Sequence, residues 1–260
     1  MKAFFRECVV AMIDLSGKTA FITGASRGIG EATARKMASY GAKVILTART
    51  TADIERIADD IGDSALAIAC DVSDHASVRD AISQGVSAFG SLDYCVNNAG
   101  TIEPIARIED SSAEDWSRVM DINTKGVYNV MRYGYEHLVD GGGVIINISS
   151  GAATGALEGW SHYCASKAAV LSLTKCGHKE WHDKGVHVVG LSPGTVATDM
   201  QHAIKDSGVN PVSQLDWSNH ISPEWVAEAI IWLTTDAARE HDGTDFSLKT
   251  EEGRRAVGLV

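Results

Sequence analysis

Tyr163 and Lys167, four residues apart, are the pair in this chain best suited to proton transfer; Tyr163 lies thirteen residues after Ser150. Residues i and i+4 of a helix share a face, so the Lys167 ammonium can lie beside the Tyr163 hydroxyl. A free phenol has a pKa of about 10 and is a weak base at neutral pH. A fixed cation favours phenolate, so we expect Lys167 to lower the pKa of Tyr163. Such a group can move a proton on or off an alcohol, although the same spacing occurs on solvated helix faces.

A glycine-rich turn lies near the start of the chain. Thr19–Thr23 predicts a short buried strand, and glycines 24, 28 and 30 lead into a predicted helix over Gly28–Tyr40. Such glycines let the backbone turn tightly and let a pyrophosphate approach the helix N-terminus. The spacing is Gly-x-x-x-Gly-x-Gly rather than the commoner Gly-x-Gly-x-x-Gly. The strand before it and the helix after it nevertheless favour dinucleotide binding over an ordinary turn.

Five motifs in this order resemble the short-chain dehydrogenase/reductase (SDR) family. The motifs are Thr23–Gly30, Asn97–Gly100, Asn123, Ser150 with Tyr163 and Lys167, and Pro193–Gly194 with Val196 and Thr198. They extend from Lys18 to about Met200, and the chain resembles 3-oxoacyl-carrier-protein reductases and carbonyl reductases about equally. The resemblance implies a Rossmann-type oxidoreductase that transfers a hydride between a nicotinamide and a ketone or secondary alcohol (CH–OH donors).

The resemblance also implies roles for individual side chains. Tyr163 is the expected general acid/base, and Ser150 the expected partner of the reacting oxygen, with Ser149 as the rival serine. Lys167 is expected to bind the nicotinamide ribose, and Asn123 to order a water or else to satisfy backbone groups. The expected substrate contacts are Ser150, Ala152, Trp160 and Tyr163. The expected cofactor contacts are Gly24, Ser26, Arg27, Gly28, Ile29, Gly30, Arg49, Asp71, Val72, Asn98, Ala99, Gly100, Tyr163, Lys167, Pro193, Gly194, Val196 and Thr198.

The end of the second predicted strand bears on the choice between NADP and NAD. NAD sites usually place an acid there to bind the ribose 2′-hydroxyl, whereas this sequence has Ala48 followed by Arg49. Arg49 and Arg27 have the geometry to bind a 2′-phosphate together. We therefore expect NADP(H) as the preferred cofactor. If both are ordinary surface arginines, NAD(H) remains the alternative.

Apolar runs alternate with longer helical patterns along the chain, which is typical of βαβ units. The predicted strands are Thr19–Thr23, Lys43–Thr47, Ala65–Cys70, Leu92–Val96, Val144–Ile148, Val186–Leu191 and Thr244–Leu248. The predicted helices are Gly28–Tyr40, Thr51–Ile61, Asp74–Phe89, Ala113–Leu138, His162–Lys184 and Pro223–Thr235. Right-handed crossovers then give an α/β fold, a doubly wound parallel sheet of about seven strands with helices on both faces. Ligands bind beyond the carboxyl ends of such strands, where the motif residues should meet.

The 260 residues predict one domain over 1–260. Residues 1–14 are expected to form an N-terminal arm, with Met12 as an alternative start to Met1. Residues 195–221 form a long predicted loop, which we interpret as a substrate lid or else a mobile insertion. Trp217 is expected to anchor this lid or to cover the core.

Composition and net charge limit the kinds of partner that the chain is expected to bind. The net charge is −11, from 34 acidic and 23 basic residues, which argues against nucleic acid and against a basic membrane-binding surface. No apolar run approaches the roughly 20 residues of a membrane helix, and the expected location is cytoplasmic. No metal site is expected, because Glu180 is displaced from the His-Glu-x-x-His pattern between His178 and His182. The resemblance implies a homotetramer, with a dimer as the alternative.

One other class of function stays open from the sequence. The same fold could serve as a non-redox module that senses NADP(H) and binds a partner. Such a module is expected to carry a broken Ser/Tyr/Lys set, whereas Ser150, Tyr163 and Lys167 are all present. The enzyme is therefore the favoured interpretation.

Overall fold

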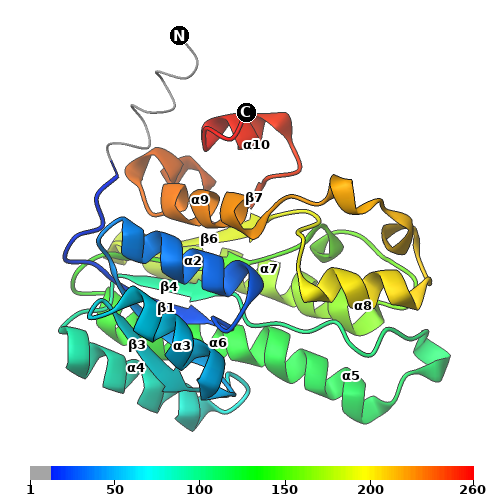
Figure 1. Ribbon diagram of the computed structural model, residues 1–260, viewed down its shortest axis with the longest axis horizontal. Coiled ribbons are helices and arrows are strands. Elements are labelled where there is room, and N and C mark those ends of the chain that lie inside the picture. The colour runs from blue at the N-terminus through cyan, green and yellow to red at the C-terminus, as the bar shows by residue number, and fades with distance from the viewer. Residues whose placement is uncertain (1–12) are drawn as a thin grey trace.

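The computed structural model describes residues 13–260, and the first twelve residues of the predicted arm lie outside that range. In the described part, seven parallel strands form one sheet in the order β3-β2-β1-β4-β5-β6-β7 (Figure 1). The strands are β1 (Thr19–Thr23), β2 (Lys43–Ala48), β3 (Ala65–Ala69), β4 (Tyr94–Asn97), β5 (Gly143–Ile148), β6 (Val186–Ser192) and β7 (Asp245–Ser247). The order reverses between β1 and β4, which is the doubly wound topology expected from the sequence.

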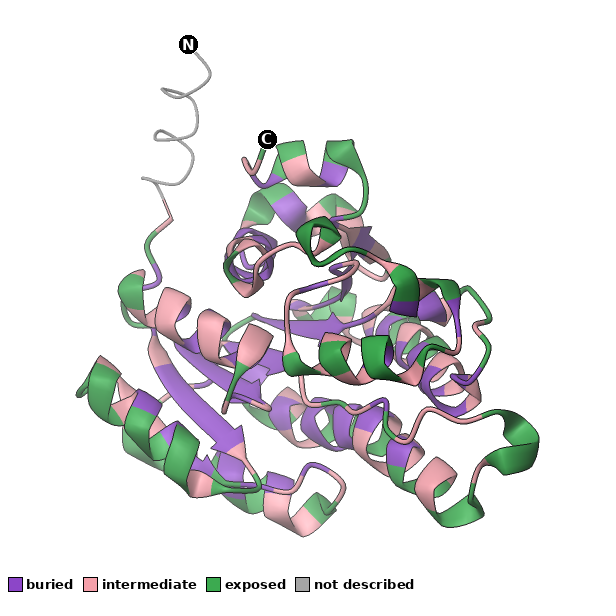
Figure 2. Ribbon diagram, turned by 45° about the vertical axis from the view of Figure 1, so that its right-hand side comes forward, coloured by how far each residue is buried: buried purple, intermediate pink, exposed green. Residues whose placement is uncertain are grey.

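Helices cover both faces of this sheet. They are α2 (Gly28–Ser39), α3 (Thr51–Ile61), α4 (His75–Phe89), α5 (Ala113–Met120), α6 (Gly126–Leu138), α7 (Ser161–Trp181), α8 (Asp199–Ser207), α9 (Pro223–Leu233) and α10 (Glu251–Ala256). Figure 2 shows the strands almost wholly buried between the two helical layers.

Alternation along the strands creates two separate cores. Successive strand residues point to opposite faces, so Ile22 packs with residues of α2, α3 and α9, whereas Phe21 packs with residues of α4, α6 and α7. Ile45 and Leu46 of β2 divide in the same way. The strands can be apolar on both sides because each face is covered.

The predicted elements largely agree with the structure. The helix predicted over 113–138 is continuous and has the predicted bounds, but it contains a π-helical segment, Asp121–Lys125, between α5 and α6. The long loop predicted over 195–221 is wrong in part, because it contains α8 and two short helical turns. Strand and helix ends elsewhere differ by a few residues, and the helix α10 was not predicted.

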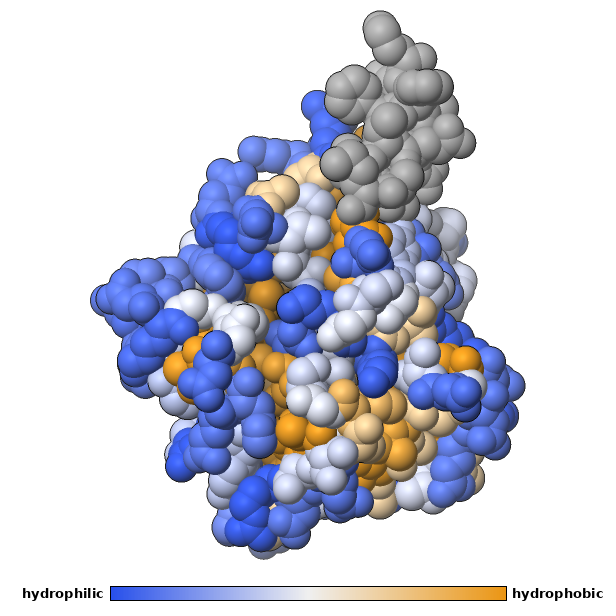
Figure 3. Space-filling view, turned by 90° about the vertical axis from the view of Figure 1, so that its left-hand side faces the viewer, coloured by the Kyte–Doolittle hydropathy of each residue, from blue (hydrophilic) through white to orange (hydrophobic). Residues whose placement is uncertain are grey.

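The surface is largely polar. The face drawn in Figure 3 is mostly hydrophilic around a smaller apolar area. Of the helices in residues 13–260, none has both the length and the apolar composition that a membrane crossing requires.

Candidate active site

The glycine turn between β1 and α2 has the backbone that its sequence requires. Gly24 and Gly28 have φ values of +63° and +58°, a region in which residues with a Cβ are strained. A Cβ at Gly30 would overlap the carbonyl oxygen of Gly24 and lie 2.8 Å from the Asn98 amide nitrogen. Glycine at these positions therefore holds the turn tightly against the start of α2. This leaves room for a phosphate at the helix N-terminus.

The loop after β4 is hydrogen-bonded to the glycine turn. The Thr23 hydroxyl accepts hydrogen bonds from the backbone N–H groups of Asn98 and Ala99, both at 3.0 Å. The Asn98 amide in turn donates to the carbonyls of Thr23 and Gly24, at 3.0 and 3.1 Å. The two motifs thus form one hydrogen-bonded unit at the carboxyl ends of neighbouring strands.

The other expected cofactor residues lie at the same edge. Asp71 follows β3 and accepts hydrogen bonds from Ser73, while Val72 is buried and its carbonyl accepts from Asn129. Arg49 is exposed directly after β2. The remaining predicted contacts fall in the glycine turn or in the loops after β4 and β6, and these are Ser26, Ile29, Gly100, Pro193 and Gly194.

The loop after β6 reaches back to the glycine turn. A Cβ at Gly28 would lie 3.2 Å from Thr198 Cγ2, so these segments touch. Arg27 pairs with Asp199 of α8, with 3.4 Å between Nε and Oδ2, and both side chains are largely exposed. Arg27 is therefore close to the lid as well as to the predicted phosphate position.

The predicted lid is closed at its base by a parallel bridge between Val196 and Ile221. Trp217 does not enter the core: it is 39% exposed and stacks between His202 and His220, with ring centroids 4.5 and 5.0 Å away. Both partners lie within 195–221, so the stacking joins two parts of the lid, which agrees with the expected role of Trp217 as a lid anchor and not with a role in covering the core.

Asn123 lies in the π-helical segment and is completely buried. Its side-chain oxygen accepts from the Thr101 N–H at 2.8 Å, and its amide donates to the Thr101 carbonyl at 2.8 Å and to Ser166 Oγ at 3.0 Å. The side chain thus joins the loop after β4 to α7. In this structure the side chain satisfies backbone groups of the loop after β4, and the ordering of a water stays a prediction.

The two neighbouring serines have different partners. The Ser149 hydroxyl is buried and donates to Asp245 of β7 at 3.0 Å. Ser150 is only partly buried, and its hydroxyl accepts from the Ala152 N–H at 3.1 Å. The Ser149 hydroxyl is therefore used in a hydrogen bond to β7, whereas the Ser150 hydroxyl can still donate a hydrogen bond.

Tyr163 and Lys167 are both buried on one face of α7. The Lys167 ammonium lies 5.6 Å from the centre of the Tyr163 ring and donates to the Ile148 carbonyl at 2.7 Å. Burial raises the pKa of Tyr163 to about 12, against an opposing effect of Ser150. Burial lowers the pKa of Lys167 to about 8, and Asp245 opposes this shift. The expected lowering of the Tyr163 pKa by Lys167 is therefore wrong for this structure, because desolvation of the phenol dominates.

An apolar cluster surrounds the Tyr163 ring. Trp160 meets this ring edge-on, with centroids 5.6 Å apart, and Ala152, also an expected substrate residue, packs in the same cluster. The cluster is completed by Ile102 of the loop after β4 and Ile204 of α8. These two side chains were not predicted, because only the fold brings their loops over the tyrosine.

His162 is a further residue that sequence reasoning missed. It is buried, its Nδ1 accepts from the Tyr163 N–H at 2.8 Å, and its Nε2 lies 2.7 Å from the Pro104 carbonyl. The first contact leaves the proton on Nε2, which donates to Pro104. His162 thus ties the start of α7 to the loop after β4. Its only sequence signal was its place beside Tyr163.

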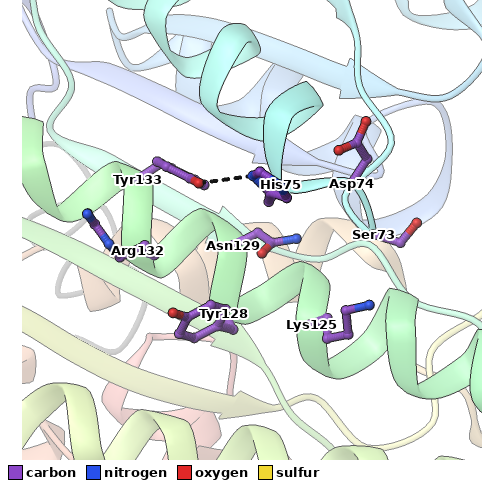
Figure 4. Close-up of a pocket in the computed structure, with 8 residues that line it drawn as sticks. All are labelled: Ser73, Asp74, His75, Lys125, Tyr128, Asn129, Arg132 and Tyr133. Carbon is purple, nitrogen blue, oxygen red and sulfur yellow. Dashed lines mark hydrogen bonds between the residues drawn. The ribbon is translucent and has the colours of Figure 1, made fainter.

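One cavity in the described part of the chain lies away from these residues. It has a volume of about 390 Å³ and is formed by α6 and the start of α4 (Figure 4). His75 and Tyr133 meet across it at 3.2 Å. The cavity contains none of Ser150, Tyr163 and Lys167, so we base the site on the chemistry at the strand ends.

A glycine turn of this kind, at the same sheet edge as a serine and a buried tyrosine and lysine, is typical of nicotinamide-dependent oxidoreductases. The short chain dehydrogenase family model matches residues 18–208. The chain is 35% identical over 238 residues to D-threitol dehydrogenase of Mycolicibacterium smegmatis, covering 89% of this chain and 91% of that protein. It is 34% identical to 3beta-hydroxysteroid dehydrogenase 1 of Eggerthella lenta, covering 89% and 92% of the two chains.

Solved structures agree. The NADH complex of 3-ketoacyl-(acyl-carrier-protein) reductase from Brucella melitensis superposes with a TM-score of 0.82 at 32% identity, covering 90% of this chain and 98% of that one. A short-chain type dehydrogenase/reductase from Mycobacterium marinum gives a TM-score of 0.84 at 32% identity, covering 92% and 96%. The chain belongs to the short-chain dehydrogenase family. It is an NAD(P)-dependent oxidoreductase that acts on CH–OH groups.

Proposed function

We propose that the protein is an NADP(H)-dependent oxidoreductase that interconverts a ketone and a secondary alcohol, with Tyr163 as the general acid/base. The burial of Tyr163 and Lys167 on one face of α7, with Tyr163 in an apolar cluster, carries this proposal. The glycine turn fits a dinucleotide, because Gly24, Gly28 and Gly30 let the backbone fold tightly at the N-terminus of α2, where N–H groups can bind a pyrophosphate. The bound nicotinamide supplies or accepts the hydride.

The side chains of this chain handle the remaining proton. In reduction, the substrate oxygen gains negative charge, Ser150 donates a hydrogen bond to it, and Tyr163 donates the proton. In oxidation, Tyr163 takes the proton back as phenolate. Lys167 stabilises that phenolate through its charge. The apolar cluster excludes water, which strengthens both interactions.

The preference for NADP(H) rests on two arginines and one missing acid. Arg27 and Arg49 are exposed on neighbouring loops at the cofactor edge, and Ala48 stands where an NAD site would carry a carboxylate. Removing a charge-assisted contact of about 1.5–3 kcal/mol weakens binding roughly tenfold or more. Arg49→Ala should therefore weaken NADPH and leave NADH unchanged. Arg79→Ala, on the exposed face of α4, should change neither affinity.

The substrate pocket is apolar on the sides that the structure describes. Ala152, Trp160 and Ile204 pack in one cluster with Tyr163, and Ile204 comes from α8 of the lid over 195–221. We propose that these residues select a cyclic or otherwise bulky apolar carbonyl compound, and that the single domain assembles as a homotetramer. Two of the relatives are named for threitol and a steroid, so both types of alcohol belong in the test.

The decisive experiment is turnover combined with cofactor titration. NADPH and NADH are titrated by fluorescence, and activity is then measured on cyclohexanol, threitol, a 3β-hydroxysteroid and a 3-oxoacyl thioester. Tyr163→Phe should lower kcat by about 10²–10⁴-fold while the NADPH affinity stays near that of the wild type. Tyr128→Phe, at a half-exposed tyrosine on α6, is the control. Full activity in Tyr163→Phe would refute the acid/base assignment.

A further inference from the structure

A buried carboxylate on the last strand has no role in the mechanism described so far. Asp245 Oδ2 accepts from the Ser149 hydroxyl at 3.0 Å. Its other oxygen, Oδ1, is buried and has no hydrogen-bond partner in residues 13–260. A charged oxygen without a donor is costly in a protein interior, so its retention needs a counter-charge nearby.

The fold makes room for this carboxylate on the side of the sheet that faces α7. Phe246, the next residue, packs in the core under α9, so Asp245 points to the opposite face. Gly190 of β6 pairs in register with Asp245, and a Cβ there would lie 2.7 Å from Oδ1. Any larger residue at Gly190 would push the carboxylate away.

The carboxylate is linked to the end of β5, where the catalytic groups meet. Ser149, its hydrogen-bond donor, lies between Ile148 and Ser150. The Ile148 carbonyl accepts from the Lys167 ammonium at 2.7 Å. A short stretch of backbone therefore connects Asp245 with Lys167 and with the catalytic serine.

We propose that Asp245 is a positioning residue of the active site: its carboxylate is the buried counter-charge that keeps Lys167 as an ammonium ion beside Tyr163. This proposal rests on the role of Tyr163 and Lys167 under the proposed function. It assigns to β7 a part in proton transfer that Ser149 and the α7 residues do not supply.

The charges on the facing elements agree with this role. Burial lowers the pKa of Lys167 to about 8, and the effect of Asp245 is the one that raises it. Burial raises the pKa of Asp245 to about 6, opposed by Ser149, Lys167 and Lys175, the last two on α7. Between these pH values both members of the pair are charged. Without the carboxylate, Lys167 would lose its proton nearer to neutral pH.

The test is the pH dependence of kcat/KM for ketone reduction, measured with NADPH and the ketone of the most reactive substrate in the panel. In this direction Tyr163 donates its proton, and the rate falls on the alkaline side when Lys167 loses its proton, at about pH 8. Asp245→Asn keeps an oxygen that accepts from Ser149 but removes the charge, so Lys167 loses its proton at a lower pH. We expect the alkaline limb to move down by about one pH unit.

Two controls separate charge from structure. Ser149→Ala removes the hydrogen bond and keeps the carboxylate, so its alkaline limb should match that of the wild type. Asp242→Asn removes another buried carboxylate, one paired with His187 at 2.6 Å and with Arg239 at 3.5 Å, and should also leave the limb in place. If Asp245→Asn does not fold, Asp245→Thr offers a smaller acceptor with the same expected shift.

Each outcome bears on one proposal. An alkaline limb that moves down only in the Asp245 variants supports the counter-charge. An unchanged limb in an active Asp245→Asn enzyme overturns it, as does an upward shift, which would mean that Asp245 does not hold the proton on Lys167. Equal shifts in Ser149→Ala would mean a purely structural role. Absence of wild-type turnover would instead refute the proposed function, and this proposal with it.

Discussion

Replacing Gly30 by alanine tests how the glycine turn is held. The added Cβ would overlap the Gly24 carbonyl oxygen and lie 2.8 Å from the Asn98 amide nitrogen, whereas ordinary contact begins at 3.4 Å. Either the turn or the start of α2 must therefore move by more than half an ångström. That movement breaks the 3.1 Å hydrogen bond from Asn98 to Gly24.

The sizes of the opposing effects decide whether Gly30→Ala raises or lowers the free energy of unfolding. Overpacking costs about 1–3 kcal/mol, and the lost hydrogen bond adds about 1 kcal/mol. Alanine in place of glycine within a helix returns about 1 kcal/mol. The net result is a free energy of unfolding lower by about 1–3 kcal/mol. Because the moved atoms form the predicted phosphate site, we expect NADPH affinity to fall at least tenfold, equivalent to about 1.4 kcal/mol.

Chemical denaturation and fluorescence titration measure the two effects. Gly141→Ala is the matched control, since Gly141 has a negative φ or extended backbone and an added Cβ would meet nothing within 4 Å. That variant should be as stable as the wild type or slightly more stable. If Gly30→Ala unfolds and binds NADPH as the wild type does, the turn is not held as the structure indicates.

Two further predictions concern stability. Asp93 accepts from Lys18 Nζ at 2.8 Å and from the Thr19 N–H at 2.9 Å, so Asp93→Ala should lower the free energy of unfolding by about 2 kcal/mol. Asp80→Ala, at an exposed ion pair, is the control and should change that free energy by less than about 1 kcal/mol. Equal effects of the two variants in urea unfolding would contradict this prediction. The folded-state pKa of Asp245, about 6, lies above its ordinary value of 3.8. The stability that this group contributes is therefore complete below about pH 4 and is lost as the pH rises through 6. Asp245→Asn should gain stability relative to the wild type over that interval, and a free-energy difference between the two proteins that stays constant with pH would contradict the shift.

The sheet and its edge were predictable because they depend on local pattern and on chain order. The alternation of strands and helices predicted the doubly wound parallel sheet, and the helix Thr51–Ile61 has the predicted bounds. A parallel sheet places all carboxyl ends on one edge, so Gly24, Asn98 and Ser150 meet there whatever their spacing in the chain. This part of the site follows from topology alone.

The remaining features depend on tertiary contacts. The π-helical segment at Asn123 places its amide within hydrogen-bond distance of Thr101 and Ser166, and helical periodicity does not contain that information. The raised pKa of Tyr163 comes from burial, in a cluster that includes Ile102, about sixty residues earlier in the chain. The sequence did not indicate a role for Asp245 for the same reason, since only the pairing of β6 with β7 brings it within hydrogen-bond distance of Ser149.

The π-helical segment also sets a constraint on chain length. In an α-helix each residue advances by about 100° around the axis, so the wider turn at Asp121–Lys125 offsets the faces of α5 and α6 from the phase of one continuous helix. Deleting one residue there would remove the extra residue of the π-helical turn, so that α5 could run into α6 as a regular α-helix and the Asn123 amide would leave Thr101 and Ser166. The number of residues between Ser112 and Gly126 is therefore as much a part of the site as their chemical types, and a point deletion would be more damaging there than most substitutions.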